Sequence, residues 1–210
     1  MNSEYYKTRY SFSKERSKVW KAICEYLQEY IEPAKDIVLD LGCGYCDFIN
    51  NIRASKKIAV DISLESQLYA NQDVLFYESS ITSLTMIEDE SIDVVFASNL
   101  LEHLNDDEIS KSITEVIRVL RTNGRFIIIQ PNFKYCFREY FDDYTHKKIF
   151  THISLSDLLR SYKFRAIKIY PKFLPLTLKS RLPKNYWLTK LYLSLPFKPL
   201  AKQMLLIFKK

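Results

Sequence analysis

An apolar run that enters a glycine-containing turn is the feature of this sequence that most constrains its fold. Residues 37–44 read IVLDLGCG, so Asp40 is the only charged residue before a turn with glycines at positions 42 and 44. The whole chain has only 3 glycines, and two of them stand here. Glycine permits positive φ and a close approach of the backbone to another group. A strand that ends in such a turn is typical of an α/β fold with a ligand against the turn.

Short apolar runs alternate with amphipathic stretches along most of the chain. The runs carry few polar residues, as expected of strands that are covered on both faces. Strands that alternate with helices at this spacing predict right-handed crossovers and a parallel, doubly wound sheet. The expected strands are 37–44, 56–63, 74–79, 91–99, 125–132, 165–171 and 203–210, and the expected helices are 14–31, 47–55, 64–71, 105–121 and 154–162.

Polar residues indicate where several of these elements begin and end. Asn105 can cap the helix that follows it, in which the first turn is acidic and Arg121 stands in the last turn. Ser154 is expected to open the next helix along the chain. The dipeptide Asn123-Gly124 predicts a turn before the strand at 125–132.

Length and composition predict one globular domain. A chain of 210 residues with 47% hydrophobic and 27% charged residues has room for one core and is not of the disordered type. We expect a single domain over 1–210, with a helical lead-in at 1–35, a cofactor-binding core at 36–170 and a basic, Pro-rich insertion at 171–202. No apolar run approaches a membrane span and the N-terminus lacks an apolar signal segment, so we expect a cytoplasmic protein with free thiols.

Charge is distributed unevenly along the chain. Residues 134–210 carry 17 Lys and Arg against 4 Asp and Glu, and no acidic residue follows Pro171. The stretch 173–202 combines this basic charge with Leu, Trp, Tyr and Phe. Two interpretations stay open for it: a packed cap on the substrate side, or an interfacial segment that contacts anionic lipid at the inner membrane face.

An acid at the end of the second expected strand points to a nucleoside ligand. Asp61 stands 21 residues after Asp40, where a carboxylate can accept hydrogen bonds from both hydroxyls of a ribose. A dinucleotide-binding turn would need a third glycine for the pyrophosphate, whereas the chain has Asp47 there, which would repel it. Asp40 suits a ligand with an ammonium group. These residues therefore favour S-adenosylmethionine over NAD.

Four segments carry a family resemblance. VLDLGCGYCDF, AVDIS, SIDVVFASNLLEHL and LRTNGRFIIIQPN resemble, in order and spacing, the motifs of the class I S-adenosylmethionine-dependent methyltransferases, over about residues 36–170. The resemblance implies a Rossmann-like three-layer αβα sandwich, with a mostly parallel seven-stranded sheet and an antiparallel last strand.

The same resemblance implies which residues bind the cofactor. The first turn would contact the methionine moiety, the end of the second strand the ribose, residues 80–81 the adenine, and residues 98–99 the region under the sulfonium. Two positions depart from the family pattern, because Cys46 replaces a glycine and Ser80 replaces an acid near the adenine amino group. The expected cofactor-binding residues are Asp40, Gly42, Cys43, Gly44, Asp61, Ile62, Ser80, Ile81, Ser98 and Asn99.

A finer resemblance begins at residue 130. The stretch QPNFKYCFREYFDDYTHKKIFTHISLSDLLRSYKF resembles methyltransferases of bacterial polysaccharide and surface-glycan biosynthesis. It implies a small-molecule or glycan acceptor, a sugar in a nucleotide-linked or lipid-linked glycan, and not a nucleic acid. Asp143 or His146 would remove a proton from the acceptor hydroxyl or amine. The residues placed over the substrate are Tyr140, Asp142, Asp143, Tyr144 and His146.

Two alternatives remain. Glu102 and His103 resemble part of a Glu-x-x-Glu-His metal cluster found in small-RNA 3′-terminal and ubiquinone-pathway methyltransferases, but Asn99 replaces its first acid. His146 could supply a further ligand in the folded state. We expect no metal, and an RNA or quinone-type, metal-assisted enzyme is the first alternative. A cofactor-binding scaffold without methyl transfer is the second. The acceptor atom and the oligomeric state stay open.

Overall fold

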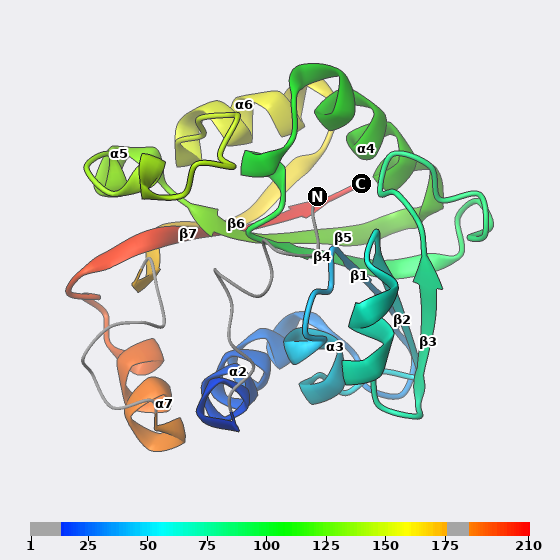
Figure 1. Ribbon diagram of the computed structural model, residues 1–210, viewed down its shortest axis with the longest axis horizontal. Coiled ribbons are helices and arrows are strands. Elements are labelled where there is room, and N and C mark those ends of the chain that lie inside the picture. Colours follow the sequence, from blue (N-terminus) through cyan, green and yellow to red (C-terminus); the bar gives the residue numbers. More distant parts are fainter. Residues whose placement is uncertain (1–13, 176–184) are drawn as a thin grey trace.

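The computed structural model describes residues 14–175 and 185–210 (Figure 1). Within these residues a seven-stranded sheet has the order β3-β2-β1-β4-β5-β7-β6. Neighbouring strands are parallel from β3 to β5, and β7 is antiparallel to both β5 and β6. The expected Rossmann-like sheet with an antiparallel last strand is confirmed. The strands are β1 (Ile37–Leu41), β2 (Lys56–Asp61), β3 (Val74–Glu78), β4 (Ile92–Ser98), β5 (Leu120–Pro131), β6 (Arg165–Pro175) and β7 (Ala201–Lys209).

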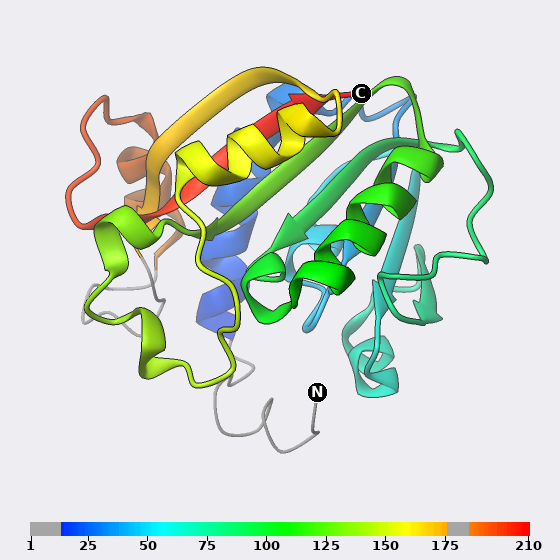
Figure 2. The same ribbon diagram turned by 90° about the horizontal axis from the view of Figure 1, so that it is seen from above.

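Helices cover both faces of the sheet, which explains why the strands are apolar on both sides. One face carries α4 (Asp106–Val119) and α6 (His152–Ser161), and the other carries α2 (Lys14–Leu27), α3 (Asp47–Asn51) and α7 (Tyr186–Ser194). Figure 2 looks onto the first face, with α4 in green and α6 in yellow lying across the strands. Along β5, Phe126 and Ile128 belong to the core on this face, and Ile127 and Ile129 to the core on the other.

Three expected helices are shorter or tighter than predicted. The first ends at Leu27 and continues only as the 3-10 turn η1 (Gln28–Tyr30). The second ends at Asn51 rather than at residue 55, because Ile52 is buried and takes extended backbone geometry. The stretch 64–71 forms the 3-10 helix η2 (Leu64–Tyr69). The helix η2 lies in the short link between the paired strands β2 and β3, and a 3-10 helix covers more length per residue than an α-helix.

The boundary between α4 and β5 differs most from the prediction. The helix ends at Val119 and the strand begins at Leu120, so Arg121 lies in the strand and not in a last helical turn. Leu120 is fully buried and pairs with Ile92, which draws the chain into the sheet early. The register then shifts between Ile92 and Val94. Residues 123–124 therefore form an irregularity within the strand instead of a turn before it.

The helix caps are partly as expected. The Asn105 side chain accepts a hydrogen bond from the Glu108 amide, and the Glu108 side chain accepts one from the Asn105 amide, which confirms the cap of α4. The expected start at Ser154 is wrong: α6 begins at His152 with Thr151 as its cap, and Ser154 completes the capping box three residues later. Parts of the lead-in 1–35 and of the insertion 171–202 lie outside the described residues.

Two further properties bear on the expected setting of the protein. No described helix combines the length and the apolar character needed to cross a bilayer. The four cysteines are free, buried thiols. Within the insertion, β6 continues to Pro175 and α7 forms from residue 186, so part of this segment has regular structure that its prolines did not suggest.

Candidate functional site

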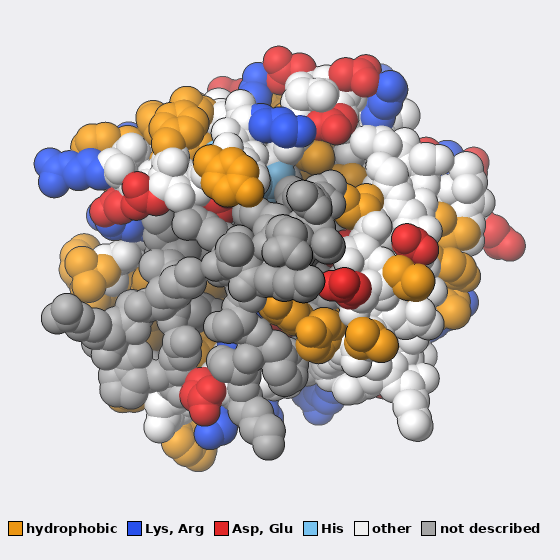
Figure 3. All heavy atoms as spheres, in the orientation of Figure 1, with side chains coloured by type: hydrophobic (Ala, Val, Ile, Leu, Met, Phe, Trp, Pro, Cys, Tyr) orange, Lys and Arg blue, Asp and Glu red, His pale blue; other side chains and the backbone are white. Residues whose placement is uncertain are grey.

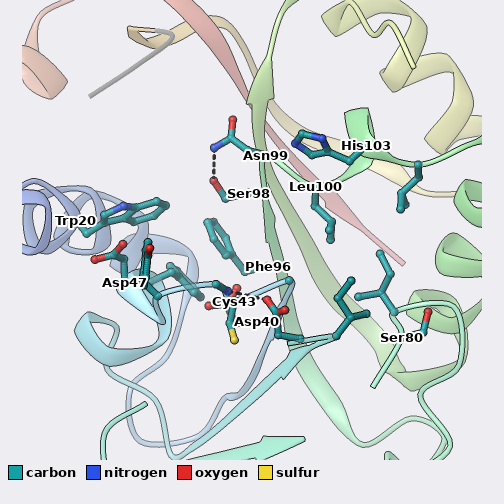
Figure 4. A pocket seen from close by; sticks show the side chains of 18 of the residues that line it. Trp20, Asp40, Cys43, Asp47, Ser80, Phe96, Ser98, Asn99, Leu100 and His103 are labelled. Atoms are coloured by element: carbon teal, nitrogen blue, oxygen red, sulfur yellow. Dashed lines mark hydrogen bonds between the residues drawn. The ribbon is translucent and has the colours of Figure 1, made fainter. Parts of the chain in front are cut away.

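A cavity of about 210 Å³ lies at the carboxyl ends of β1, β2 and β4. Figure 4 shows Trp20 and Asp47 on one side of it, Ser80 on the opposite side, and Asn99 with His103 at a third. The fold brings every expected cofactor-binding residue to this one cavity. They are Asp40, Gly42, Cys43, Gly44, Asp61, Ile62, Ser80, Ile81, Ser98 and Asn99.

The turn after β1 needs both of its glycines. Gly42 and Gly44 have φ values of 65° and 51°, in the left-handed region that side chains disfavour. A Cβ on Gly42 would also lie 2.8 Å from Leu100 Cδ1. Cys46 takes φ 56° without being glycine, so its backbone is strained where the family pattern has a smaller residue. The turn therefore holds backbone close to the cavity at a conformational cost.

Asp61 fixes the end of β2 against this turn. Its Oδ2 accepts a hydrogen bond from the Gly44 amide at 2.8 Å, and its Oδ1 accepts one from the Ser63 amide at 2.9 Å. The residue is only 2% exposed, yet it lines the cavity. A carboxylate has about four lone-pair sites, which is more than these two hydrogen bonds use.

Asp40 supplies the cavity with a buried acid. Burial, and then the charge of Asp61, raise the pKa of Asp40 well above its usual range. An ionised Asp40 would therefore gain from a positive charge in the cavity, since an opposite charge within about 4–6 Å favours the charged form of a carboxyl. The electrostatics of this end of the cavity favour a cationic ligand.

Residues of α2 and α3 form a wall that the sequence did not reveal. Phe48 stacks on Phe96 with 3.6 Å between ring centroids, and Trp20 meets Phe96 edge-on at 6.2 Å. Arg16 pairs with Asp47 at the same wall. The indole Nε1 of Trp20 is buried and has no hydrogen-bond partner among the described residues. The only sequence signal for Trp20 was its place on the apolar face of a helix, which is equally typical of a core residue.

A second polar cluster adjoins the cavity through His103. Glu102 and His103 belong to the 3-10 helix η3 (Leu101–His103), which follows β4, and His146 follows η4 (Tyr140–Asp142). One potential ligand atom from each of the three residues lies within 4.8 Å of the others. Burial raises the pKa of Glu102 to about 8, and burial followed by the charge of His146 lowers the pKa of His103 to about 4.

The two expected bases sit behind His103 and are not among the residues that line the cavity. Asp143 is 6% exposed, and its Oδ1 accepts hydrogen bonds from the Thr145 amide at 3.1 Å and the Thr145 hydroxyl at 2.6 Å. The ring of His146 lies 5.0 Å from that of His103, and its Nδ1 is 2.6 Å from the Tyr140 carbonyl oxygen. Among the described residues, Asp143 is linked to the cavity through Thr145 and His103.

Of the other three residues expected over the substrate, one is buried and two are exposed. Tyr140 is fully buried, and its hydroxyl donates to the Lys148 carbonyl at 2.5 Å, so it supports the loop. Asp142 is exposed, and Tyr144 is 80% exposed. Hydrophobic side chains reach the surface over α5 (Phe133–Cys136) and η4, at the upper left of Figure 3. Phe137 and Phe141 are more than half exposed in this segment.

Comparisons with known proteins agree with this geometry. Residues 39–128 match the family described as methyltransferase domain. Phosphoethanolamine N-methyltransferase 1 of Triticum aestivum is 32% identical over 107 residues, which are 46% of this chain and 21% of that protein. The chain thus spans about a fifth of that relative's length. The uncharacterized protein MJ0638 of Methanocaldococcus jannaschii is 28% identical over 202 residues, 91% of this chain and 81% of that protein.

Solved structures give the same fold. A SAM-dependent methyltransferase from Archaeoglobus fulgidus superimposes with a TM-score of 0.70 at 21% identity, over 99% of this chain and 98% of that one. A Bacillus halodurans protein that is described as a putative methyltransferase gives a TM-score of 0.66 at 15% identity, over 90% and 98% of the two chains. At these identities the similarity concerns the fold.

Proposed function

We propose that this chain is an S-adenosylmethionine-dependent methyltransferase, and that it methylates a hydroxyl or amino group of a sugar in a lipid-linked or nucleotide-linked glycan. The match of residues 39–128 to the methyltransferase-domain family and the shared fold support the first part. In this reaction a lone pair of the acceptor attacks the methyl carbon, the carbon–sulfur bond breaks, and the acceptor loses a proton. The observation that carries the proposal is one cavity that gathers all ten expected residues, among them the buried acids Asp40 and Asp61.

We assign the two ends of the cavity to the two ends of the cofactor. Asp61 accepts the ribose hydroxyls, and Ser80 with Ile81 borders the adenine. Asp40 and the turn at 42–44 face the positively charged methionine end. The raised pKa of Asp40 supports this assignment, because burial and the charge of Asp61 make an ionised Asp40 costly unless a positive charge lies beside it. Ser98 and Asn99 then lie beside the sulfonium, next to η3.

The acceptor would approach from the side of η3 and the segment 133–146. His103 lines the cavity there, and His146 lies next to it. The exposed rings of Phe137, Phe141 and Tyr144 offer flat apolar surfaces on which the C–H face of a sugar can pack. Of the two expected bases, His146 is the better placed to receive a proton, and Asp143 orients His103 through Thr145.

The outer face of α7 supports a lipid-linked acceptor over a nucleotide-linked one. Trp187 and Leu191 stand four residues apart on α7 and are 71% and 59% exposed, and Leu195, which directly follows the helix, is 37% exposed. The opposite face packs on α2 through Leu193, which is buried. Exposed apolar rings and chains in a segment with basic and no acidic residues suit the surface of an anionic membrane. We therefore infer peripheral contact at the inner membrane face.

The experiment is transfer of labelled methyl from S-adenosylmethionine into fractionated host extract, with Asp61→Ala as the blank. Label in the glycolipid or nucleotide-sugar fraction, absent with the variant, supports the proposal and separates its two forms. Label in RNA or quinones contradicts it and favours the alternative of that class. If the protein binds cofactor but labels no fraction, including purified glycolipid, a scaffold is the better description.

A further inference from the structure

The cluster of Glu102, His103 and His146 is held in place by two separate segments of the chain. Glu102 and His103 lie on η3, directly after β4, and His146 comes from the loop after η4. The two segments are joined by backbone hydrogen bonds from the Lys147 and Lys148 amides to the Glu102 carbonyl oxygen, at 2.8 and 3.0 Å. The three side chains therefore meet at a fixed place beside the cofactor cavity, which His103 also lines.

The carboxylate of Glu102 is the first sign of a ligand at this place. Glu102 is 1% exposed, and neither of its carboxylate oxygens has a hydrogen-bond partner among residues 14–175 and 185–210. Buried polar groups in native proteins nearly always have a partner, because burying one without compensation is costly. Glu102 thus requires either a proton or a cation beside it.

The hydrogen bonds of His103 indicate which of its two ring nitrogens carries the proton. The Thr145 hydroxyl has a single proton, and it donates this to Asp143 Oδ1 at 2.6 Å. The Thr145 oxygen must then accept from His103 Nδ1, 3.0 Å away, and the Thr145 carbonyl at 3.4 Å is also an acceptor. The proton of neutral His103 is thereby fixed on Nδ1, so that Nε2 carries a lone pair.

The position of the proton on His146 follows from its hydrogen bond to a different partner. Its Nδ1 lies 2.6 Å from the Tyr140 carbonyl oxygen, which can only accept. Nδ1 therefore holds the proton, and in the neutral ring Nε2 carries the lone pair. A second hydrogen bond from the other ring nitrogen to a carbonyl, hydroxyl or carboxylate is typical of histidines that bind metal ions. Both imidazoles of the cluster have it.

We propose that Glu102, His103 and His146 bind one divalent transition-metal ion through a carboxylate oxygen and two imidazole nitrogens. Two histidines and a carboxylate form a known ligand set for zinc and for ferrous iron, and leave coordination positions open. Donor atoms around one zinc ion lie roughly 3–4 Å apart. The three candidate ligand atoms all lie within 4.8 Å of one another, which is compatible with one shared ion after small side-chain adjustments.

The ion would use its open positions toward the cavity. It would bind the acceptor oxygen or nitrogen and make loss of its proton easier. His146, which was proposed above as the proton acceptor of the site without an ion, would then serve as a ligand, and the proton would pass to solvent. This catalytic part rests on the proposed function, whereas ion binding does not. Asp143 is then a positioning residue, since it sets the tautomer of His103 through Thr145.

The test is a titration of metal-free protein with zinc chloride and with manganese chloride, followed by calorimetry and by elemental analysis after dialysis. We expect one ion per chain. Glu102→Gln keeps the volume of the side chain and removes its charge, so it should weaken binding at least about tenfold, as should His146→Gln. Cobalt substitution should give visible absorption bands that both variants change.

The chain provides a matched control. Its third histidine, His152, lies outside the cluster and contacts Asn132, so His152→Gln should leave the stoichiometry and affinity unchanged. Binding of S-adenosylhomocysteine to every variant checks the fold and tests the cofactor site separately. The proposal is overturned if the metal-free protein binds no ion, or if Glu102→Gln and His146→Gln bind as tightly as the parent. If Glu102 is protonated and takes no part in ion binding, Glu102→Gln will bind the ion with the same affinity as the parent, which contradicts the proposal.

Discussion

Asp61→Asn is the substitution that most directly probes the proposed cofactor site. The carboxylate accepts hydrogen bonds from the Gly44 and Ser63 amides on its two oxygens. An asparagine has one oxygen and one NH₂ group, so one of these amides would face a donor instead of an acceptor. The same change removes one of the two oxygens proposed to accept the ribose hydroxyls, together with the negative charge.

The expected loss of affinity can be worked out from these contacts. A hydrogen bond to a charged group contributes about 1.5–3 kcal/mol, and the variant loses or weakens both ribose contacts. A total loss of about 2–4 kcal/mol corresponds to roughly 30- to 1000-fold weaker binding of S-adenosylmethionine. The empty protein should change less in stability, because removing the charge of Asp61 relieves Asp40, whose pKa it helps to raise.

Isothermal titration with S-adenosylmethionine and with S-adenosylhomocysteine measures this loss. Asp73→Asn is the matched control, since Asp73 is a largely exposed acid that pairs with Lys57 at the start of β2 and lies outside the cavity. It should bind both ligands like the parent. If folded Asp61→Asn bound within about threefold of the parent, the assignment of the ribose to Asp61 would be refuted.

Three further substitutions test other parts of the molecule. Trp20→Phe removes an unpartnered indole N–H at the cavity and should weaken cofactor binding about five- to tenfold; calorimetry showing equal affinity contradicts a contact there. Gly42→Ala places a side chain at φ 65° and should lower the free energy of unfolding by about 1–2 kcal/mol in urea melts; an unchanged free energy of unfolding would contradict the positive φ at this position. Trp187→Ser should weaken binding to vesicles containing anionic phosphatidylglycerol roughly tenfold, whereas Leu68→Ser, at another exposed apolar residue, should not; equal losses would indicate non-specific adhesion.

The parts of the fold that were predictable are those decided by local pattern. Strands such as β1 and β4 were recognised because burial on both faces requires continuous apolar residues, and Asn105 because a cap needs only a few neighbouring residues. The start of β5 was missed because the burial of Leu120 against Ile92 is a tertiary contact. The Asn123-Gly124 signal is local, and it could not show that the chain had already entered the sheet.

The same distinction holds for the site. Asp40 and Asp61 could be placed in advance because parallel strands bring their carboxyl ends to one edge. Arg16 and Trp20 could not, because their place depends on how α2 docks against β4 through contacts such as that of Trp20 with Phe96. The hydrogen-bonded link from Asp143 through Thr145 to His103 depends on the conformation of the loop after η4. No periodic pattern in the sequence predicts that conformation.

The end of β4 links the cofactor cavity to the histidine cluster. Asn99 takes φ 49°, a left-handed conformation that asparagine tolerates better than most residues. Its amide donates to the Ile129 carbonyl at 2.8 Å, and its side-chain oxygen accepts from Gln203 at 2.9 Å.

This sharp turn has two consequences for the site. It sets Leu100 against Gly42, on the turn proposed for the methionine end of the cofactor, and it starts η3 so that His103 faces the cavity. The side chain of Asn99 is occupied by Gln203 and Ser98, which leaves the metal ligands to the three residues of the cluster. In the proposed reaction, this single backbone turn thus sets the distance between the methyl donor and the group that receives the acceptor's proton or polarises the acceptor. The rate of methyl transfer depends strongly on such alignment.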